Sequence, residues 1–171
     1  MSDDELEAVL HSLIGVFDGE EVVDEFSHAL QCADNARKAG SDRELVVAAL
    51  FHDVARSPLV GPLYPELTHE LAGASWLQPR FGERVAWLVG AHTVAKIYLM
   101  ETDPGYAAAL SPESRRSAVS QARIPRSGFV ENPWWGEALL LRRFDDAAKD
   151  PNAPTPDPEA LLEIAQRLRV D

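Results

Sequence analysis

The chain has 171 residues, 46% of them hydrophobic, and a formal net charge of −12. This length suits one domain with one core, and we expect residues 1–171 to form it. The negative charge argues against nucleic acids and anionic membranes as partners. No stretch approaches the ~20 apolar residues of a membrane span, and the acidic N-terminal MSDDELEAVLHSL is unlike a signal or transit peptide. We therefore expect a cytoplasmic protein.

Apolar residues of the N-terminal half recur with helical spacing. The first amphipathic helix contains Leu6, Val9, Leu10, Leu13 and Ile14. Gly40 is the expected C-terminal glycine of the next helix, and Ser41 or Asp42 the N-cap of the one after it. The proline-rich SPLVGPLYPE predicts a loop. Helices are expected over about 21–38, 42–55, 67–77 and 82–100.

Turn and capping residues also divide the C-terminal half. Asp103-Pro104-Gly105 predicts a turn, and Ser111-Pro112 predicts the start of a helix, with Ser111 as N-cap. An irregular loop is expected over 123–133, and helices over about 135–148 and 158–170. No segment alternates like a β-strand, so the sequence predicts an all-α helical bundle.

The single cysteine, Cys32, excludes an internal disulfide and a thiolate cluster. Any bound metal ion must therefore be held by nitrogen and oxygen atoms. Cys32 lies in a helical pattern of apolar residues, where we expect a small packed side chain.

Four of the five histidines belong to an ordered pattern of the form H…HD…H…H…D. Its members are His28, His52, Asp53, His69, His92 and Asp145. Imidazole and carboxylate groups suit divalent iron, manganese and similar ions. Because a carboxylate can bridge two ions and a neutral imidazole cannot, Asp53 is the expected bridge. A lone histidine or an HD dipeptide is weak evidence of a site, but the full ordered set strongly indicates two metal ions.

The ligands divide between the two expected ions. His28, His52 and Asp145 would complete one ion, and His69 and His92 would belong to the other. Asp146 is an alternative to Asp145 on the residues alone. The remaining histidine, His11, lies outside the pattern and is given no role.

With these positions in view, the chain resembles the HD-domain superfamily. The best match is its mixed-valence di-iron oxygenase branch, which contains 2-amino-1-hydroxyethylphosphonate dioxygenase and, more distantly, myo-inositol oxygenase. The resemblance spans roughly residues 19–149, the expected metal-site core, and leaves a C-terminal surface helix at about 158–170. The matching stretches are HALQCADNA, LVVAALFHDVA, HELAGASWL, FGERVAWLVGAHTVAKIYL, LSPESRRSAVSQ and LRRFDDAAK.

The resemblance implies that the six residues of the pattern are iron ligands. It favours Asp145 over Asp146 because Asp145 follows the aromatic Phe144. It also implies a set of residues that contact substrate: Glu21, Arg56, Lys96, Ser114, Gln121 and Arg142. Helical spacing agrees for two of them, since Lys96 is four residues after His92 and Arg142 three before Asp145.

Two positions depart from the family pattern. Arg56 stands where the family commonly has a histidine, and Asp18 stands in place of its gating tyrosine. The resemblance therefore indicates the chemistry more firmly than the substrate.

The implied activity is oxidative cleavage of the C–P bond, or a similar bond, of a small 1-hydroxyalkylphosphonate-like anion by O2. The implied cofactor is an Fe2+/Fe3+ pair. The alternative is an HD-type phosphohydrolase that uses Mn2+ or another divalent metal on a phosphate ester or nucleotide. A third hypothesis is a catalytically idle domain that binds a ligand or partner, and the intact ligand set argues against it. The sequence does not indicate an oligomeric state.

Overall fold

The computed structural model describes residues 3–121 and 126–170 and shows nine α-helices, two 3-10 helices and no strand within them. The predicted all-α class is confirmed. The α-helices are α1 Asp3–His11, α2 Glu25–Lys38, α3 Arg43–Phe51, α4 His69–Phe81, α5 Glu83–Thr102, α6 Pro104–Ala109, α7 Pro112–Gln121, α8 Trp135–Asp146 and α9 Pro158–Leu168. The 3-10 helices are η1 Val54–Arg56 and η2 Gly61–Leu63.

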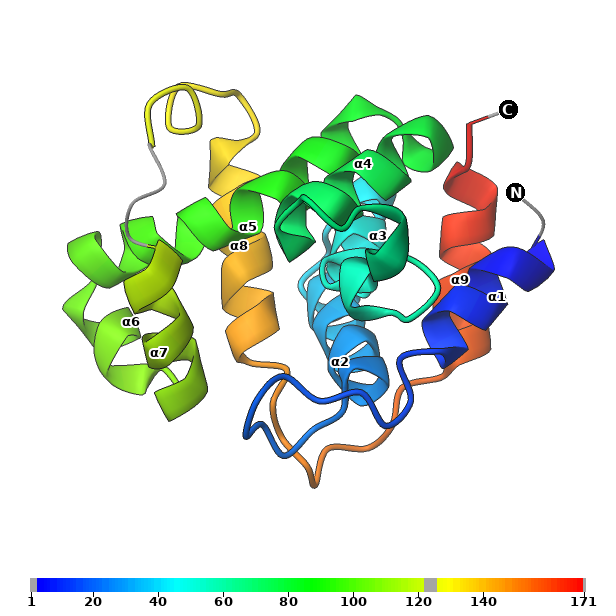
Figure 1. The fold of residues 1–171 in the computed structure, drawn as a ribbon, viewed down its shortest axis with the longest axis horizontal. Coiled ribbons are helices and arrows are strands. Elements are labelled where there is room, and N and C mark those ends of the chain that lie inside the picture. Colours follow the sequence, from blue (N-terminus) through cyan, green and yellow to red (C-terminus); the bar gives the residue numbers. More distant parts are fainter. Residues whose placement is uncertain (1–2, 122–125, 171) are drawn as a thin grey trace.

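Helix α5 runs from the middle of the bundle to the end formed by α6 and α7 (Figure 1). It packs against α3, α4 and α8 in the middle and against α6 and α7 at one end. Helices α1 and α9 pack against each other at the opposite end. In the part of the chain that the structure describes, no helix is both long and apolar enough to cross a lipid bilayer.

Helix α3 lies at the centre of the bundle, where α2, α5, α8 and α9 contact it. Every residue from Leu45 to Phe51 is buried, which explains why this run is apolar on all sides. Phe51 packs against Phe81 and Trp76 of α4, with ring centroids 6.0 Å and 6.3 Å apart. These contacts extend α4 to Phe81, beyond its predicted end, although Pro79 lies in its last turn.

Capping residues set several helix boundaries as predicted. Asp42 is the N-cap of α3 and accepts a hydrogen bond from the Leu45 amide. The hydroxyl of Ser111 likewise accepts a hydrogen bond from the amide of Ser114. Gly40 follows α2 with a positive φ of 76°, which favours glycine.

Several predicted elements differ from the structure, and α2 begins at Glu25 instead of about residue 21. The third helix ends at Phe51 instead of Ala55, and a separate 3-10 turn follows His52 and Asp53. The predicted Asp103-Pro104-Gly105 turn is the start of α6, because Asp103 caps the Tyr106 amide and proline suits a first helical position. Residues 123–125 of the predicted 123–133 loop lie outside the described residues.

A glycine closes the loop after the His52–Asp53 dipeptide. A Cβ atom at Gly61 would lie 2.4 Å from the carbonyl oxygen of Ala55, in the 3-10 turn next to Arg56. Only glycine permits this approach of two backbone segments. Gly61 therefore helps to hold the turn that follows Asp53.

We expect Gly61→Ala to lower the free energy of unfolding by about 1–3 kcal/mol, because the new methyl group must displace backbone. Chemical denaturation followed by circular dichroism measures this. The matched control is Gly136→Ala in α8, where a Cβ atom meets nothing within 4 Å. That change should be neutral or stabilising by up to about 1 kcal/mol. Equal stability of the two variants would contradict the assignment.

Candidate metal centre

The structure brings all the predicted ligands into one region, although they come from different elements. His28 lies on α2, His92 on α5 and Asp145 on α8. His52 and Asp53 follow α3, and His69 is the first residue of α4. His52, His92 and Asp145 are 3% exposed or less, so their polar atoms depend on partners within the protein.

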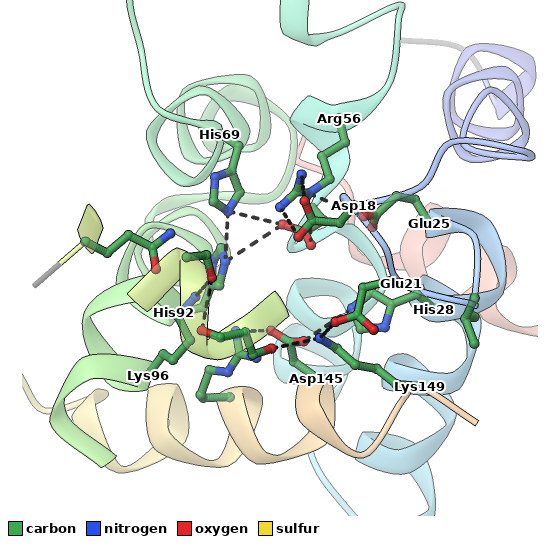
Figure 2. A pocket seen from close by; sticks show the side chains of 16 residues that line it. Asp18, Glu21, Glu25, His28, Arg56, His69, His92, Lys96, Asp145 and Lys149 are labelled. Atoms are coloured by element: carbon green, nitrogen blue, oxygen red, sulfur yellow. Dashed lines mark hydrogen bonds and ion pairs between the residues drawn. The ribbon is translucent and has the colours of Figure 1, made fainter. Parts of the chain in front are cut away.

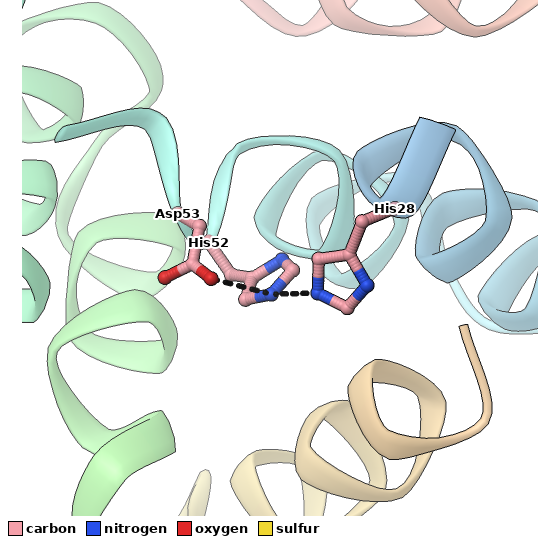
Figure 3. A group of neighbouring side chains, drawn as sticks. All are labelled: His28, His52 and Asp53. Carbon is pink, nitrogen blue, oxygen red and sulfur yellow. Dashed lines mark hydrogen bonds and ion pairs between the residues drawn. The ribbon is translucent and has the colours of Figure 1, made fainter. Parts of the chain in front are cut away.

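The first group of ligand atoms surrounds His52 (Figure 3). Its Nε2 lies 3.1 Å from Nε2 of His28 and 3.5 Å from Oδ2 of Asp53. Asp145 approaches from α8, with Oδ1 3.3 Å from His28 Nε2 and Oδ2 3.6 Å from His52 Nε2. The ligand atoms of His28, His52 and Asp53 all lie within 4.8 Å of one another, close enough to share an ion.

The second group contains Asp53, His69 and His92. Oδ1 of Asp53 lies 3.4 Å from Nε2 of His69 and 3.8 Å from Nε2 of His92. The two imidazole Nε2 atoms lie 3.3 Å apart (Figure 2). Asp53 therefore presents one carboxylate oxygen to each group, which is the geometry that a bridging ligand requires.

Each imidazole of the pattern is oriented through its other ring nitrogen. Three Nδ1 atoms face backbone carbonyl oxygens: that of His28 faces Ala148 at 3.0 Å, that of His52 faces Ala49 at 2.9 Å, and that of His92 faces Val89 at 2.6 Å. Nδ1 of His69 instead faces a carboxylate oxygen of Glu70 at 3.2 Å. A proton on Nδ1 satisfies these acceptors and leaves the Nε2 lone pair directed into the site. Lone pairs that converge at such distances need a cation or a proton between them.

The electrostatics of the ligands fit a divalent metal. Burial raises the pKa of Asp53, but Arg56 and the surrounding histidines outweigh it and hold that pKa well below its usual range. Burial lowers the pKa of His92 to about 3, so this imidazole is neutral. Among the described residues, the buried Oδ1 of Asp53 has no hydrogen-bond partner. An ionised bridging carboxylate, neutral imidazoles and an unpaired oxygen are the donors that iron or manganese would take.

His28 behaves differently from His92. Burial lowers its pKa, but the hydrogen bond and charge of Asp145 outweigh burial and raise the pKa to about 9. A metal ion at this position must therefore displace a proton from His28.

A cavity of about 130 Å³ opens in front of the ligands (Figure 2). Every residue predicted to contact substrate lines it: Glu21, Arg56, Lys96, Ser114, Gln121 and Arg142. His52 does not line it and lies behind the other ligands. The cavity is thus bounded by the candidate metal ligands on one side and by cationic and hydroxyl side chains on the other.

Lys96 and Arg142 differ in whether a carboxylate neutralises their charge. Lys96 Nζ donates to the Ser117 hydroxyl at 2.8 Å, and within the described chain it forms no ion pair. Burial and the nearby Arg142 lower the pKa of Lys96 to about 8. Arg142 instead pairs with Asp145 at 2.5 Å and with Asp146.

Asp146 points away from the candidate ligands. It accepts the Tyr106 hydroxyl at 2.5 Å and pairs with Arg142. Asp145, by contrast, faces both His28 and His52. This geometry favours Asp145 over Asp146 as the ligand, in agreement with the sequence-based choice.

Five residues that line the cavity were not among the predicted contacts: Asp18, Val23, Glu25, Ser117 and Lys149. Lys149 lies beyond the end of α8 at Asp146, so helical spacing from Asp145 does not identify it. Asp18 and Arg56, the two departures from the family pattern, form a bidentate ion pair with each other. His11 lies away from the site, 3.8 Å from Glu7, and Cys32 is buried as predicted.

Comparisons with known proteins agree with this arrangement. Residues 26–122 match the HD domain. The chain is 34% identical over 148 residues to hydroxymethylphosphonate dioxygenase of Gimesia maris, in a match that covers 81% of this chain and 74% of the relative. It is 30% identical over 150 residues to [1-hydroxy-2-(trimethylamino)ethyl]phosphonate dioxygenase (glycine-betaine-forming) of Leisingera caerulea, covering 82% and 76%. The chain belongs to the HD-domain family.

Proposed function

We propose that this protein is an HD-domain dioxygenase that cleaves the C–P bond of a small 1-hydroxyalkylphosphonate. The observation that carries the proposal is the division of the ligand atoms into two groups that share Asp53, beside a cavity lined by cationic side chains. The names of both relatives support the same reaction class.

The residues of the two groups would hold an Fe2+/Fe3+ pair. His28, His52 and Asp145 would bind one iron, His69 and His92 the other, and Asp53 both. When bound, such a pair supplies the redox chemistry that activates O2 for oxidation of the substrate.

The chain's own part is to bind and orient the anion. Lys96 offers an ammonium group without an ion pair in the described structure, and Ser114 offers a buried hydroxyl. Arg142 adds positive charge beside them while it positions Asp145. Charge-assisted hydrogen bonds from such groups suit the three oxygens of a phosphonate.

Gln121 provides a possible acceptor on the same wall. Its Oε1 is buried and lacks a hydrogen-bond partner within the part of the chain that is described. A substrate hydroxyl or a protonated phosphonate oxygen would satisfy it.

The overall reaction balances without an external reductant. A 1-hydroxyalkylphosphonate dianion and one O2 give a carboxylate, a hydrogen phosphate dianion and one proton. The C–P bond and one C–H bond break, carbon is oxidised and O2 is reduced. Each turnover therefore releases one phosphate for each O2 consumed.

The second candidate is a metal-dependent phosphohydrolase, because the HD-domain match fits that activity too. The same donor set would hold Mn2+ or another divalent metal, and the same cationic wall would bind a phosphate ester. The dependence on O2 separates the two functions.

We expect iron-loaded protein to consume O2 and release phosphate from hydroxymethylphosphonate in equal amounts, since one molecule of each enters the balanced reaction. An oxygen electrode and a phosphate assay measure the ratio. Release of phosphate from esters under anaerobic conditions, without O2 uptake on any hydroxyphosphonate, would instead establish the hydrolase.

Anaerobic loading should give about two irons per chain, because the two ligand groups share a bridging carboxylate. Asp53→Asn should reduce this to about one or less, since a neutral amide is a poor bridge between cations. Metal analysis measures occupancy, and EPR of the half-oxidised protein reports coupling between the ions. The control is Asp34→Asn, a buried aspartate outside the site that pairs with Arg37 and Lys38. Two irons in Asp53→Asn would disprove the bridge.

We expect Lys96→Met to weaken binding of methylphosphonate by about 10- to 100-fold, because a charge-assisted hydrogen bond is lost. Iron content should stay unchanged, since Lys96 contacts none of the ligands directly in the described structure. Calorimetry on anaerobic, iron-loaded protein gives the affinity. Lys38→Met removes an exposed lysine far from the cavity and serves as the control. An unchanged affinity in Lys96→Met would show that the anion binds elsewhere.

A further inference from the structure

Two acid–base pairs line the cavity outside the ligand set and the anion-binding wall. One joins Glu21 to Lys149, and the other joins Asp18 to Arg56 (Figure 2). Neither carboxylate belongs to the candidate metal ligands. Both face the space that is left for the remainder of the substrate.

Glu21 is neutralised by a lysine of the chain itself. Its Oε1 accepts hydrogen bonds from Lys149 Nζ and from the Ser111 hydroxyl, both at 2.7 Å. Burial raises the pKa of Glu21, but these partners outweigh it and keep the pKa below its usual value. The Lys149 and Glu21 side chains are only 21% and 14% exposed, so water screens this pair weakly.

Lys149 also connects Glu21 to the anion-binding wall. Its Nζ donates to the Ser114 hydroxyl at 2.9 Å. The lysine therefore lies between the carboxylate and a residue proposed to bind the phosphonate. A substituent that extends from the substrate toward Glu21 meets this ammonium group as well.

Asp18 is neutralised in the same way. Both of its carboxylate oxygens accept hydrogen bonds from Arg56, each at 2.9 Å. Such bidentate pairs have defined geometry and are stronger than single contacts. Arg56 Nε also lies 3.4 Å from carboxylate oxygens of Glu25 and Asp53, so the arginine supplies counter-charge to that wall.

We propose that the substrate's carbon carries hydrogen or a short uncharged alkyl group, and not an ammonium group. This assignment rests on the proposed function. An ammonium substituent near Glu21 would have to displace Lys149 from its carboxylate and leave that cation unpaired in a largely buried site, which is costly. Near Asp18 it would compete with Arg56, which also lies beside Glu25 and Asp53. A cavity of about 130 Å³ also suits a small substrate.

One relative is named for an uncharged substituent and the other for a charged one, so sequence identity alone does not indicate which substituent this chain accepts. One is named for hydroxymethylphosphonate and the other for a substrate with a trimethylamino group. The paired carboxylates favour a substrate of the first kind for this chain.

The test compares two ligands of equal shape, propylphosphonate and 2-aminoethylphosphonate, which differ by a terminal methyl or ammonium group. Neither carries the 1-hydroxyl group, so binding is measured without turnover by calorimetry on anaerobic, iron-loaded protein. We expect the wild type to bind the propyl compound at least about tenfold more tightly. The ratio of kcat/KM for the 1-hydroxylated counterparts should follow the same order.

Lys149→Met removes the ammonium group and leaves Glu21 without its basic partner. The ratio of the two ligand affinities should therefore move about tenfold toward the amine. Lys149→Arg keeps the charge and should keep the wild-type ratio, as should the distant Lys38→Met. Because both ligands share the phosphonate, a lost contact to Ser114 cancels in the ratio. Glu21→Gln should still prefer the propyl compound.

Two results would overturn the assignment. They are a wild type that prefers the amine and a Lys149→Met variant with an unchanged ratio. Binding of neither phosphonate would overturn the proposed function as well, whereas tight binding with the opposite preference would overturn only the substrate class.

Discussion

The compensation of buried negative charge is the constraint on which the centre of this molecule depends. Asp53 and Asp145 are ionised carboxylates enclosed by helices, and the imidazoles around them direct Nε2 atoms toward the same two points. Arg56 and Arg142 supply part of the opposite charge from the sides. The unpaired Oδ1 of Asp53 faces the Nε2 atoms of His69 and His92, where a cation would satisfy both the carboxylate and the lone pairs.

The fold meets this constraint by ending helix α3 at Phe51, directly before His52 and Asp53. The apolar run of α3 is buried on all sides and cannot shift without exposing its surface. The backbone leaves the helix at His52, so that His52 faces α2 while Asp53 faces α4 and α5. Gly73 of α4 allows close packing here, since a Cβ atom at this position would lie 3.2 Å from Cγ1 of Val89 and 3.5 Å from Cγ1 of Val54. Close packing thus fixes the dipeptide before any ion is bound.

The ordered pattern in the sequence named residues that the structure brings close together, although they come from segments far apart in the chain. Lys96 and Arg142 were implied by the family resemblance, and their spacing from His92 and Asp145 agrees with it. The ion pairs of Asp18 with Arg56 and of Glu21 with Lys149 could not be read in this way, because they join residues from segments far apart in the chain. The start of α6 was missed because Asp103-Pro104 fits both a turn and a capped helix, and packing of Tyr106 decides between them.

The ion pairs Glu21–Lys149 and Asp18–Arg56 lie outside the candidate metal ligands, in the part of the cavity that we propose selects the substrate. The candidate ligands are held by backbone carbonyls and by neighbouring helices, so changing one of them disturbs the whole centre. Glu21 and Asp18 instead precede α2 on an irregular segment, and their charge is set by single basic partners. A change of one partner exposes or neutralises a carboxylate without moving an imidazole. The proposed choice between charged and uncharged substituents therefore lies mainly with Lys149, which contacts none of the candidate metal ligands in the described structure, whereas Arg56 also lies 3.4 Å from Asp53 and serves the candidate metal centre as well.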